Sequence, residues 1–585
     1  MLGANAVLRM PSKYASIRIR RWFRSSEAAH ILLAVIVGVI AAGATILLQL
    51  VAHGMQHLFY GIGINRLSAL ASIRHPWKLV FLPLGGLVLV LVNRLFPQRH
   101  SAIDVVEANA LHGGRIPPFD TFRVSLQTIV SNGFGASVGL EAAYAQAGGG
   151  LASIVGQWFQ LRRRDLRTLV GAGAGAAIGA AFGAPLTGAF YAFEIMIGAY
   201  VPAAIAPVAA ASLAAALLTR QLGVTPYLVA SAAGEPISNL AYVLYAALGV
   251  LTALIGIAIM KLQTGTERLV TRSPVPAAWR PVVGGLLLIP IAWATPQALS
   301  SGHGALRLEL ALQPALAFLL FVFVLKTLAS VISLSFGFRG GLFFASLFLG
   351  SLLGPIYAQL VNLVAGQPLL DGTDAALVGM AALAVTIVGG PMTCSLLVLE
   401  TTHNFALTGA VITAALCASA FTRAHFGYSF STWRMHLRGT NIRGPRDIGR
   451  MRALTAERLM RRDPTKVDAA LSIARFRELV PLGSTSRVVL TADGGYYRGI
   501  VQTAQAFAPT LDPAAPIASL AQLEGETVAP NAPVEGILDH FEQHGADDLA
   551  VVDADGRVLG LLTEKYVNRR FIEESEKAQS ELFGE

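Results

Sequence analysis

The chain has 585 residues, of which 54% are hydrophobic and only 14% are charged, against about 25% charged residues in soluble domains. This composition excludes an ordinary soluble protein and indicates an integral membrane protein. The formal net charge of +10 does not indicate nucleic-acid binding, because the basic residues cluster in short segments beside apolar stretches.

About ten apolar windows approach the ~20 residues that a membrane-crossing helix needs, which predicts a multi-pass protein. The first window is too long for the apolar core of a cleavable signal peptide, so we expect it to remain as a span. The windows lie near residues 29–52, 76–96, 168–200, 202–218, 240–261, 281–299, 314–336, 341–365, 375–400 and 405–421.

The basic clusters predict the orientation of the chain, because cytoplasmic loops carry an excess of Lys and Arg. They lie at residues 18–24, at residues 162–167 and along residues 434–452. We therefore expect a cytoplasmic N-terminal segment (1–25) and a cytoplasmic C-terminus in a protein of the cell (inner) membrane. Both cysteines, Cys394 and Cys417, lie inside apolar windows and are expected to be buried thiols.

The membrane part repeats itself. GAPLTGAFYAFE begins at residue 183 and GGPMTCSLLVLE begins 206 residues later, with Gly, Pro, Thr and the final Glu at the same spacing. VGLEA at 138 and GGLFF at 340 share a Gly-Leu core. Repeated segments interrupted by Gly and Pro are typical of transporters with two inverted halves and helices broken at mid-membrane. We predict halves at about 26–220 and 235–440, with the substrate site where the broken helices meet.

The glycine-rich segments predict the charge of that substrate. A helix that begins inside the membrane leaves up to four N–H groups unpaired and points the positive end of its dipole into the protein. Segments 131–139, 339–341 and 100–102 are candidate helix starts of this kind. Glu141 follows the first of them, in a region with scarcely another charge. We therefore expect an anion to bind, in competition with this carboxylate.

The composition changes after residue 440, which predicts a linker (441–455), a soluble domain (456–575) and a short tail (576–585). Residues 488–501 and 549–562 share an apolar strand, an Asp-Gly turn and a second apolar strand, as two hairpins of a repeated module would. The two modules, at about 456–510 and 511–575, resemble a tandem pair of CBS modules.

The membrane part resembles the CLC family of chloride channels and chloride/proton antiporters over residues 25 to 440. The family's G-[RK]-E-G-P motif appears as Gly139-Leu140-Glu141-Ala142-Ala143, and its G-x-F-x-P motif as Gly341-Leu342-Phe343-Phe344-Ala345. Its A-P-L-x-G-x-x-F-x-x-E segment is nearly intact at 184–194. GGPMTCSLLVLE at 389–400 matches the corresponding segment of the second half. These four matches in the right order, followed by a CBS pair, make the resemblance specific. It implies an all-α membrane domain of the CLC type, joined to a cytoplasmic α/β domain.

The resemblance also implies site residues. Glu141 corresponds to the gating glutamate, whose carboxylate occupies the anion path and leaves it on protonation. The backbone of Gly139 and Leu140 and that of Phe343 and Phe344 would hold the anion. The family's central serine corresponds to Ser101, in the altered stretch His100-Ser101-Ala102-Ile103-Asp104. The family's tyrosine corresponds to Phe430, which has no hydroxyl, and Tyr428 lies two residues earlier.

Further residues have both a functional and a structural interpretation. Family antiporters often carry a second glutamate after the one at 194, but here Ile195 follows, so Glu194 is either a structural cap or a substitute proton carrier. Lys326 is expected to neutralise carbonyl groups or a glutamate such as Glu400. His100 and Arg339 are possible additional polar groups along the path.

CBS modules of this kind bind adenine nucleotides in a cleft, where an Asp three residues after a Thr holds the ribose. Here Tyr566 stands three residues after Thr563, and Gln502 and Gln505 stand in the first module. These departures favour a dimerising, regulatory or stabilising role over binding of ATP or AMP.

The sequence therefore predicts a homodimeric chloride transporter in the lipid membrane, with proton exchange expected and a passive chloride channel as the alternative. A divalent-cation transporter with a CBS pair is a distant alternative. Cation selection needs acidic rings or carbonyl oxygens along the path, whereas this membrane part has few carboxylates and has helix starts led by glycine. An enzyme is not expected, since there is no His-Glu-x-x-His and no Gly-x-Ser-x-Gly motif. No cofactor or metal is implied.

Overall fold

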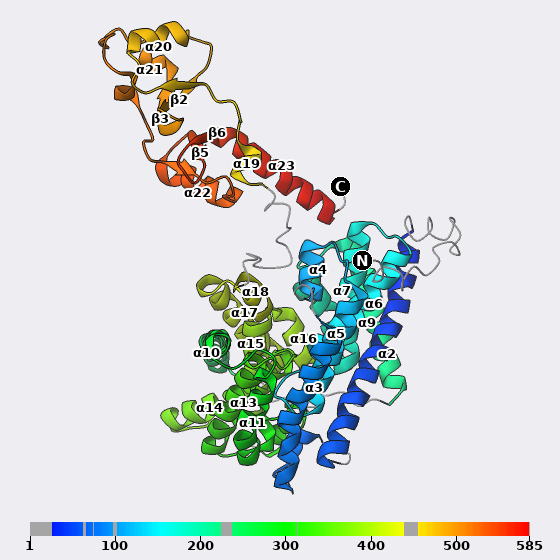
Figure 1. Ribbon diagram of the computed structural model, residues 1–585. Coiled ribbons are helices and arrows are strands. Elements are labelled where there is room, and N and C mark those ends of the chain that lie inside the picture. The colour runs from blue at the N-terminus through cyan, green and yellow to red at the C-terminus, as the bar shows by residue number, and fades with distance from the viewer. Residues whose placement is uncertain are drawn as a thin grey trace. The chain divides into compact units, whose positions relative to one another are not determined.

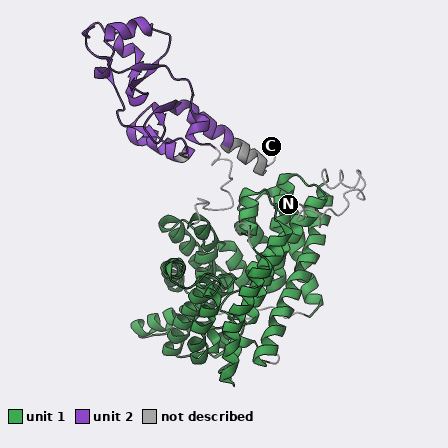
Figure 2. Cartoon of the chain, viewed as in Figure 1, with its two compact units in different colours: residues 1–446 green, residues 447–585 purple. Residues whose placement is uncertain are grey.

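A computed structural model describes residues 26–62, 66–73, 75–97, 102–223, 237–312, 314–437 and 454–583 (Figure 1). The chain divides into two compact units, residues 1–446 and residues 447–585 (Figure 2). The first unit is helical and the second contains all the described strands. Each unit is described by itself below.

The first unit consists of two runs of helices that follow one another in the same order. The first run comprises α2 (Glu27–Tyr60), α3 (Phe81–Leu95), α4 (Val105–Leu111), α5 (Pro118–Gly133), α6 (Glu141–Trp158), α7 (Arg163–Phe182), α8 (Pro185–Tyr191), the π-helical turn η3 (Ala192–Ile197) and α9 (Pro202–Gln221). The short 3-10 turns η1 (Leu67–Ala69) and η2 (Pro76–Val80) lie between α2 and α3.

The second run repeats this succession of long and short helices, which confirms the predicted duplication. It comprises α10 (Asn239–Arg272), α11 (Arg280–Ala294), the turn η4 (Pro296–Ala298), α12 (His303–Leu312), α13 (Leu316–Ser335), α14 (Phe343–Ala365), α15 (Gly372–Val388), α16 (Pro391–Thr402) and α17 (Phe405–His425), followed by α18 (Phe430–Leu437). Helices in corresponding positions of the two runs pack together, α3 against α11 and α8 against α16.

Seven described helices are long and apolar enough to cross a membrane. Two of the apolar windows are divided in the structure: residues 168–200 break at Gly183, and residues 375–400 break at Gly389. Both glycines adopt positive φ, which costs glycine little and closes a helix without strain. Helices α4, α5 and α6 lie outside every predicted window. In α5, buried polar side chains such as Arg123 and Gln127 lower the hydropathy, and α4 has only seven residues.

Close backbone contacts at glycine recur at corresponding positions of the two runs. In the first run a Cβ on Gly148 would overlap the carbonyl of Gly173, which joins α6 to α7. In the second run Gly350 meets Gly379 in the same way, which joins α14 to α15. Small residues let helices approach closely in membranes, so these contacts fix the positions of α6 and α14.

The second unit contains two modules of the same topology, as the sequence predicts. In each, a short parallel strand pairs with the first strand of an antiparallel hairpin: β1 (Lys466–Asp468) with β2 (Arg487–Ala492) and β3 (Tyr496–Gln502), and β4 (Thr527–Val528) with β5 (Asp548–Val552) and β6 (Val558–Thr563). The helices are α19 (Ala456–Leu459), α20 (Ile473–Leu479), α21 (Thr503–Ala506), α22 (Val534–His544) and α23 (Glu564–Phe583), with the turn η6 (Ile517–Leu520).

Apolar and charged contacts join these two modules. Val489 and Ile500 of the first module and Val558 and Leu561 of the second form one small buried cluster. Arg487 also makes ion pairs with Asp547 and Asp548 across the two modules. The pair therefore forms one folded body.

Two glutamates of the repeated segments cap helices of opposite halves. The carboxylate of Glu194, in the first half, accepts hydrogen bonds from the N–H groups of Met392 (3.0 Å) and Thr393 (2.8 Å) and from the Thr393 hydroxyl (2.7 Å) at the start of α16. The carboxylate of Glu400, in the second half, accepts the corresponding bonds from Leu186 (2.8 Å) and Thr187 (2.8 and 2.7 Å) at the start of α8. Each half thus closes a helix start of the other.

We expect Glu400→Ala to lower the stability of the membrane unit, because it leaves the start of α8 without acceptors. Loss of a helix cap costs about 0.5–2 kcal/mol, and hydrogen bonds to a charged group raise that cost. The midpoint of thermal unfolding in detergent measures the effect. Glu27→Gln, which alters an exposed acid in the first turn of α2, is the matched control and should leave the midpoint unchanged. Equal midpoints for both variants would contradict the capping role.

Candidate functional site

Two helix starts from opposite halves meet inside the membrane unit. The chain leaves α5, runs through residues 134–140 and begins α6 at Glu141, and it leaves α13, runs through residues 336–342 and begins α14 at Phe343. Gly139 and Gly341 pair with each other just before these starts, through N–H to carbonyl bonds of 3.0 and 3.2 Å. The positive ends of two helix dipoles therefore converge at one place.

Glu141 occupies the first position of α6 and is only 2% exposed. Its side chain turns back over the preceding loop, so that a Cβ on Gly139 would overlap its Oε2 atom. The backbone N–H groups of Glu141 and Phe344 lie close enough to interact with the carboxylate, and among the described Lys and Arg side chains none lies within 4.0 Å of it. A buried carboxylate thus lies where the helix starts converge.

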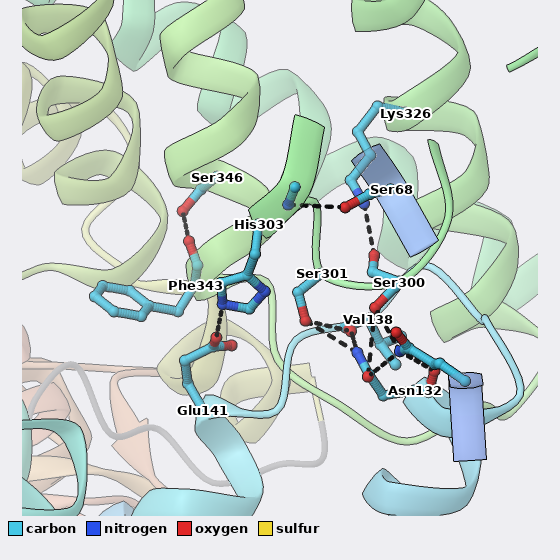
Figure 3. A network of polar contacts seen from close by, with 12 residues as sticks. Ser68, Asn132, Val138, Glu141, Ser300, Ser301, His303, Lys326, Phe343 and Ser346 are labelled. Carbon is cyan, nitrogen blue, oxygen red and sulfur yellow. Dashed lines mark hydrogen bonds and ion pairs between the residues drawn. The ribbon is translucent and has the colours of Figure 1, made fainter. Parts of the chain in front are cut away.

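The Glu141 carboxylate lies next to a histidine that was not predicted from the sequence. His303 Nε2 lies 3.8 Å from Glu141 Oε1, and the His303 side chain is 5% exposed (Figure 3). His303 begins α12, so it comes from another broken helix of the second half. Its ring lies 3.6 Å, centre to centre, from the ring of Phe344. The sequence pattern that could have indicated His303 is Gly302-His303-Gly304 after two serines. This stretch occupies the place in the second half that residues 100–105 occupy in the first.

A buried hydrogen-bond network holds the loops before α6 and α12 against each other (Figure 3). The Asn132 amide donates to the Val138 carbonyl (2.7 Å) and to the Ser301 hydroxyl (2.9 Å). Gln56 on α2 donates to Asn132 Oδ1 (2.9 Å) and to the Ser300 hydroxyl (3.0 Å). Because these side chains are fully or almost fully buried, the network fixes the positions from which Glu141 and His303 project.

Lys326 belongs to the same network. Its Nζ atom donates to the Ser137 hydroxyl (2.9 Å) and to the carbonyls of Ser300 (2.7 Å) and Ala298 (3.3 Å), and the side chain is fully buried. The interpretation that Lys326 neutralises carbonyl groups agrees with these contacts, whereas Glu400 lies elsewhere, at the start of α8. A buried ammonium beside the loop that precedes Glu141 adds positive potential to the site.

Aromatic rings line the site beside Glu141. Phe343 packs edge-on against Phe182 (5.6 Å between centres) and Tyr191 (6.2 Å), and Phe344 stacks on Phe182 (6.1 Å). The phenol of Tyr191 is buried and within electrostatic range of Glu141 and Asp104. Tyr191 is a second residue that the sequence analysis did not select. Its position in the repeated segment 183–194 gave no sign that it faces this site.

The structure places the other sequence-derived candidates as follows. Gly139, Leu140, Phe343 and Phe344 meet at the junction, whereas His100 and Ser101 lie outside the described residues. Phe430 is buried in an apolar cluster, with the Arg434 guanidinium 5.7 Å from its ring centre. The Tyr428 hydroxyl lies 3.3 Å from Nδ1 of His436.

Three more candidates have contacts outside the Glu141 site. Glu194 caps α16 and also accepts a bond from the Tyr200 hydroxyl (2.9 Å). The backbone N–H of Arg339 donates to the Ser131 hydroxyl (2.9 Å), which holds the loop before α14 against α5. Thr563 ends β6 in the second unit and pairs with Asp548, and Tyr566 is 39% exposed on α23. Their functional roles stay predictions.

Comparison with known proteins agrees with this architecture. The family model described as voltage gated chloride channel matches residues 84–423, more than half of the chain. The chain belongs to this family. A model of the CBS domain matches residues 524–573, the second of the two modules. The protein is therefore a multi-pass membrane protein of a channel and transporter family, not of an enzyme family.

The names of similar proteins mention chloride or fluoride. The voltage-gated ClC-type chloride channel ClcB of Escherichia coli is 26% identical over 408 residues, which are 67% of this chain and 96% of that protein. A chloride/fluoride channel protein of Pseudomonas syringae is 30% identical over 312 residues, 50% of this chain and 66% of that one. A slow cyanobacterial Cl-/H+ antiporter shares the fold, with a TM-score of 0.62 at 21% identity, over 70% of this chain and 97% of that one.

We expect Gly139→Ala to displace the Glu141 carboxylate, because the new methyl group would occupy the position of Oε2. Gly341→Ala is the matched control, since a Cβ there meets no atom closer than 3.6 Å. Structures of both variants should show the Glu141 side chain moved in the first and unchanged in the second. An unmoved carboxylate in Gly139→Ala would contradict the described conformation.

Proposed function

We propose that the protein exchanges chloride for protons across the membrane, with Glu141 as both the gate and the outer proton carrier. The observation that carries the proposal is the single carboxylate at the junction of two helix starts from opposite halves. Membership of the chloride channel family supports chloride as the substrate. The chloride/fluoride name of one relative makes fluoride a second anion to test.

The mechanism follows from competition for one place. A charge at mid-membrane costs roughly 2.5 to 3.5 kcal/mol on the insertion scale, and the converging N–H groups and the Lys326 ammonium offset that cost for the Glu141 carboxylate. The same groups stabilise a chloride ion. Once a proton neutralises Glu141, the carboxyl group loses this attraction and leaves, and chloride enters. The carboxylate and the anion occupy this place in turn. Each time Glu141 returns, it carries its proton from the outer side into the path, so proton movement is coupled to chloride movement.

His303 acts in this proposal as a positioning residue for the gate. Its Nε2 atom lies just beyond hydrogen-bond distance of Glu141 Oε1, so a small rotation of the glutamate forms the bond. Stacking on Phe344 fixes the imidazole ring. The imidazole therefore stabilises the carboxylate in the blocking position and offers a polar partner to an entering anion.

Tyr191 supplies the hydroxyl that Phe430 lacks. Its phenol is buried against Phe343, within electrostatic range of Glu141. A phenolic O–H is a neutral hydrogen-bond donor, which suits a halide in an otherwise apolar passage. We assign to it the role of a donor to chloride inside the gate.

The inner proton route differs from the pattern with two consecutive glutamates. Glu194 accepts three hydrogen bonds as the cap of α16 and a fourth from the Tyr200 hydroxyl, and these donors would lose their acceptor if Glu194 moved. We therefore propose that water, and not Glu194, delivers protons from the inner side past Ile195. A passive chloride channel is the alternative function, and it requires no such route.

We propose that the protein forms a homodimer with one path per subunit, in the inner membrane, with both termini in the cytoplasm. The CBS pair then acts on the cytoplasmic side as a regulatory or stabilising domain. The substitutions Tyr566, Gln502 and Gln505 at the ribose-contacting positions favour this role over binding of adenine nucleotides.

The decisive measurement is transport by the purified protein in liposomes. Under a chloride gradient, we expect chloride to flow down its gradient and an acid-base dye to report protons driven uphill. Glu141→Gln should abolish proton movement while chloride still flows, because the amide cannot carry a proton. Chloride flow without proton movement in the unaltered protein would favour the channel. Flux of magnesium without chloride would contradict the whole proposal.

We expect His303→Phe to weaken the block by Glu141, because phenylalanine keeps the ring stacking and removes the polar partner. A hydrogen bond to a charged group contributes about 1.5–3 kcal/mol, so chloride flux at neutral pH should rise at least about tenfold. His57→Phe, at an exposed position of α2, is the matched control. A flux equal in both variants would show that His303 has no part in gating.

A further inference from the structure

We propose that the second CBS module contains a transition-metal site formed by Glu526, His540 and His544, with zinc as the ion that fits it. These side chains lie in the second unit, in a separate compact part of the chain from the chloride path. The proposal is independent of chloride transport and goes beyond it.

Helix α22 places both histidines on one side. They are four residues apart, which is one turn of an α-helix, so their side chains lie one above the other. Their ring centres are 4.4 Å apart. Ile537 and Phe541 on the same helix are buried in the core of the module. That packing fixes the rotation of α22 and keeps the two histidines at the surface, facing the turn before β4.

The distances between the ligand atoms match those of a metal site. Glu526 Oε2 lies 3.2 Å from Nε2 of His540 and 3.2 Å from Nε2 of His544, and all three atoms lie within 4.8 Å of one another. Zinc binds His nitrogen and carboxylate oxygen at about 2.0–2.2 Å in a tetrahedron. Neighbouring ligand atoms of such a tetrahedron are roughly 3.3 Å apart, close to the two distances observed.

Hydrogen bonding orients the ligands for a metal. Nδ1 of His544 lies 3.0 Å from the backbone carbonyl of His540, so Nδ1 carries the hydrogen and donates it. Nε2 of the neutral ring then presents a lone pair to Glu526, and histidines that bind metals usually donate their other ring N–H to a carbonyl or carboxylate in this way. Nε2 of His540 is buried and has no hydrogen-bond partner among the described residues. A cation between the three groups would satisfy it.

A backbone turn positions Glu526 on the other side of the site. The residue closes this turn through a bond from its N–H to the carbonyl of Leu523 (3.2 Å), immediately before β4. Tyr497 of the first module donates its hydroxyl to the same carbonyl (2.9 Å). Burial, together with the nearby Glu526 and Glu524, raises the pKa of Tyr497 well above its usual range, so the hydroxyl remains a donor.

The donor set selects the class of ion. Two imidazoles and one carboxylate suit zinc and other late first-row metals, whereas magnesium and calcium prefer sites made of oxygen alone. A metal here would join α22 to the turn before β4, to which Tyr497 of the first module donates a hydrogen bond. Metal binding should therefore stabilise the second unit and stiffen the contact between its two modules.

The test uses full-length, tag-free protein in detergent, dialysed against zinc chloride, with bound zinc measured by elemental analysis. We expect the double variant His540→Gln/His544→Gln to bind one zinc ion fewer per chain than the unaltered protein. Glu542→Gln, an exposed acid between the two histidines on α22, is the matched control and should keep that ion. With cobalt chloride as a second probe, the same ion should give a visible absorption band typical of tetrahedral coordination.

Two results would overturn the proposal: no zinc bound by the unaltered protein, or equal zinc content in the double variant and the Glu542→Gln control. The first result would mean that Glu526 makes only ion pairs with the histidines. If the double variant fails to fold, Glu526→Gln replaces it, because glutamine keeps the size of the side chain and removes the charge. Zinc binding in this variant should fall at least about tenfold in affinity, and an unchanged affinity would likewise overturn the proposal.

Discussion

The pairing of Gly139 with Gly341 is the contact on which the site depends. Two N–H to carbonyl bonds join the loops of opposite halves, and a helix starts two residues beyond each of these glycines. The pairing brings the two helix starts to one place, so that the positive ends of both dipoles converge beside the Glu141 carboxylate. The buried network of Gln56, Asn132, Ser300 and Ser301 keeps the neighbouring loops in register with it.

Polar groups inside the membrane unit have separate tasks. Glu194 and Glu400 bind helix starts, and Lys326 binds carbonyl groups and a serine, so each has partners that fix its position. Among the described side chains, the one that Glu141 approaches is His303, and that contact is long at 3.8 Å. The contrast fits a division in which the first three hold the framework and Glu141 is the group that moves.

Much of the fold could be predicted from the sequence, and the reasons are physical. The repeated Gly-Pro-Thr-Glu spacing predicted duplicated halves with broken helices, and the alternating hairpins predicted the CBS pair. Helix α5 lies outside the apolar windows because buried Arg123 and Gln127 make an interior helix look polar, whereas the start of α6 at Glu141 was predicted from the glycine-rich segment before it. Apolar windows 168–200 and 375–400 hid helix breaks, since hydropathy does not register a change of direction at glycine.

The site was predicted only where a motif marked it. Glu141, Gly139 and Phe343 stand in motifs, and the structure brings them together, but their function remains a prediction. His303 and Tyr191 lie about 160 and 50 residues from Glu141 along the chain, and no local pattern shows that they face it. The three zinc-binding candidates were missed for the same reason, because Glu526 approaches His540 and His544 only through the turn before β4.

The reciprocal caps bear on the history of the molecule. Glu194 accepts hydrogen bonds at the start of a second-half helix, and Glu400 does so at the start of a first-half helix. Neither half alone therefore supplies acceptors for the N–H groups at the start of its own helix. An ancestral chain with a single run of these helices would have needed a second copy, inserted in the opposite sense, to supply the missing acceptors. Gene fusion would then have made permanent a partnership that the two glutamates already required.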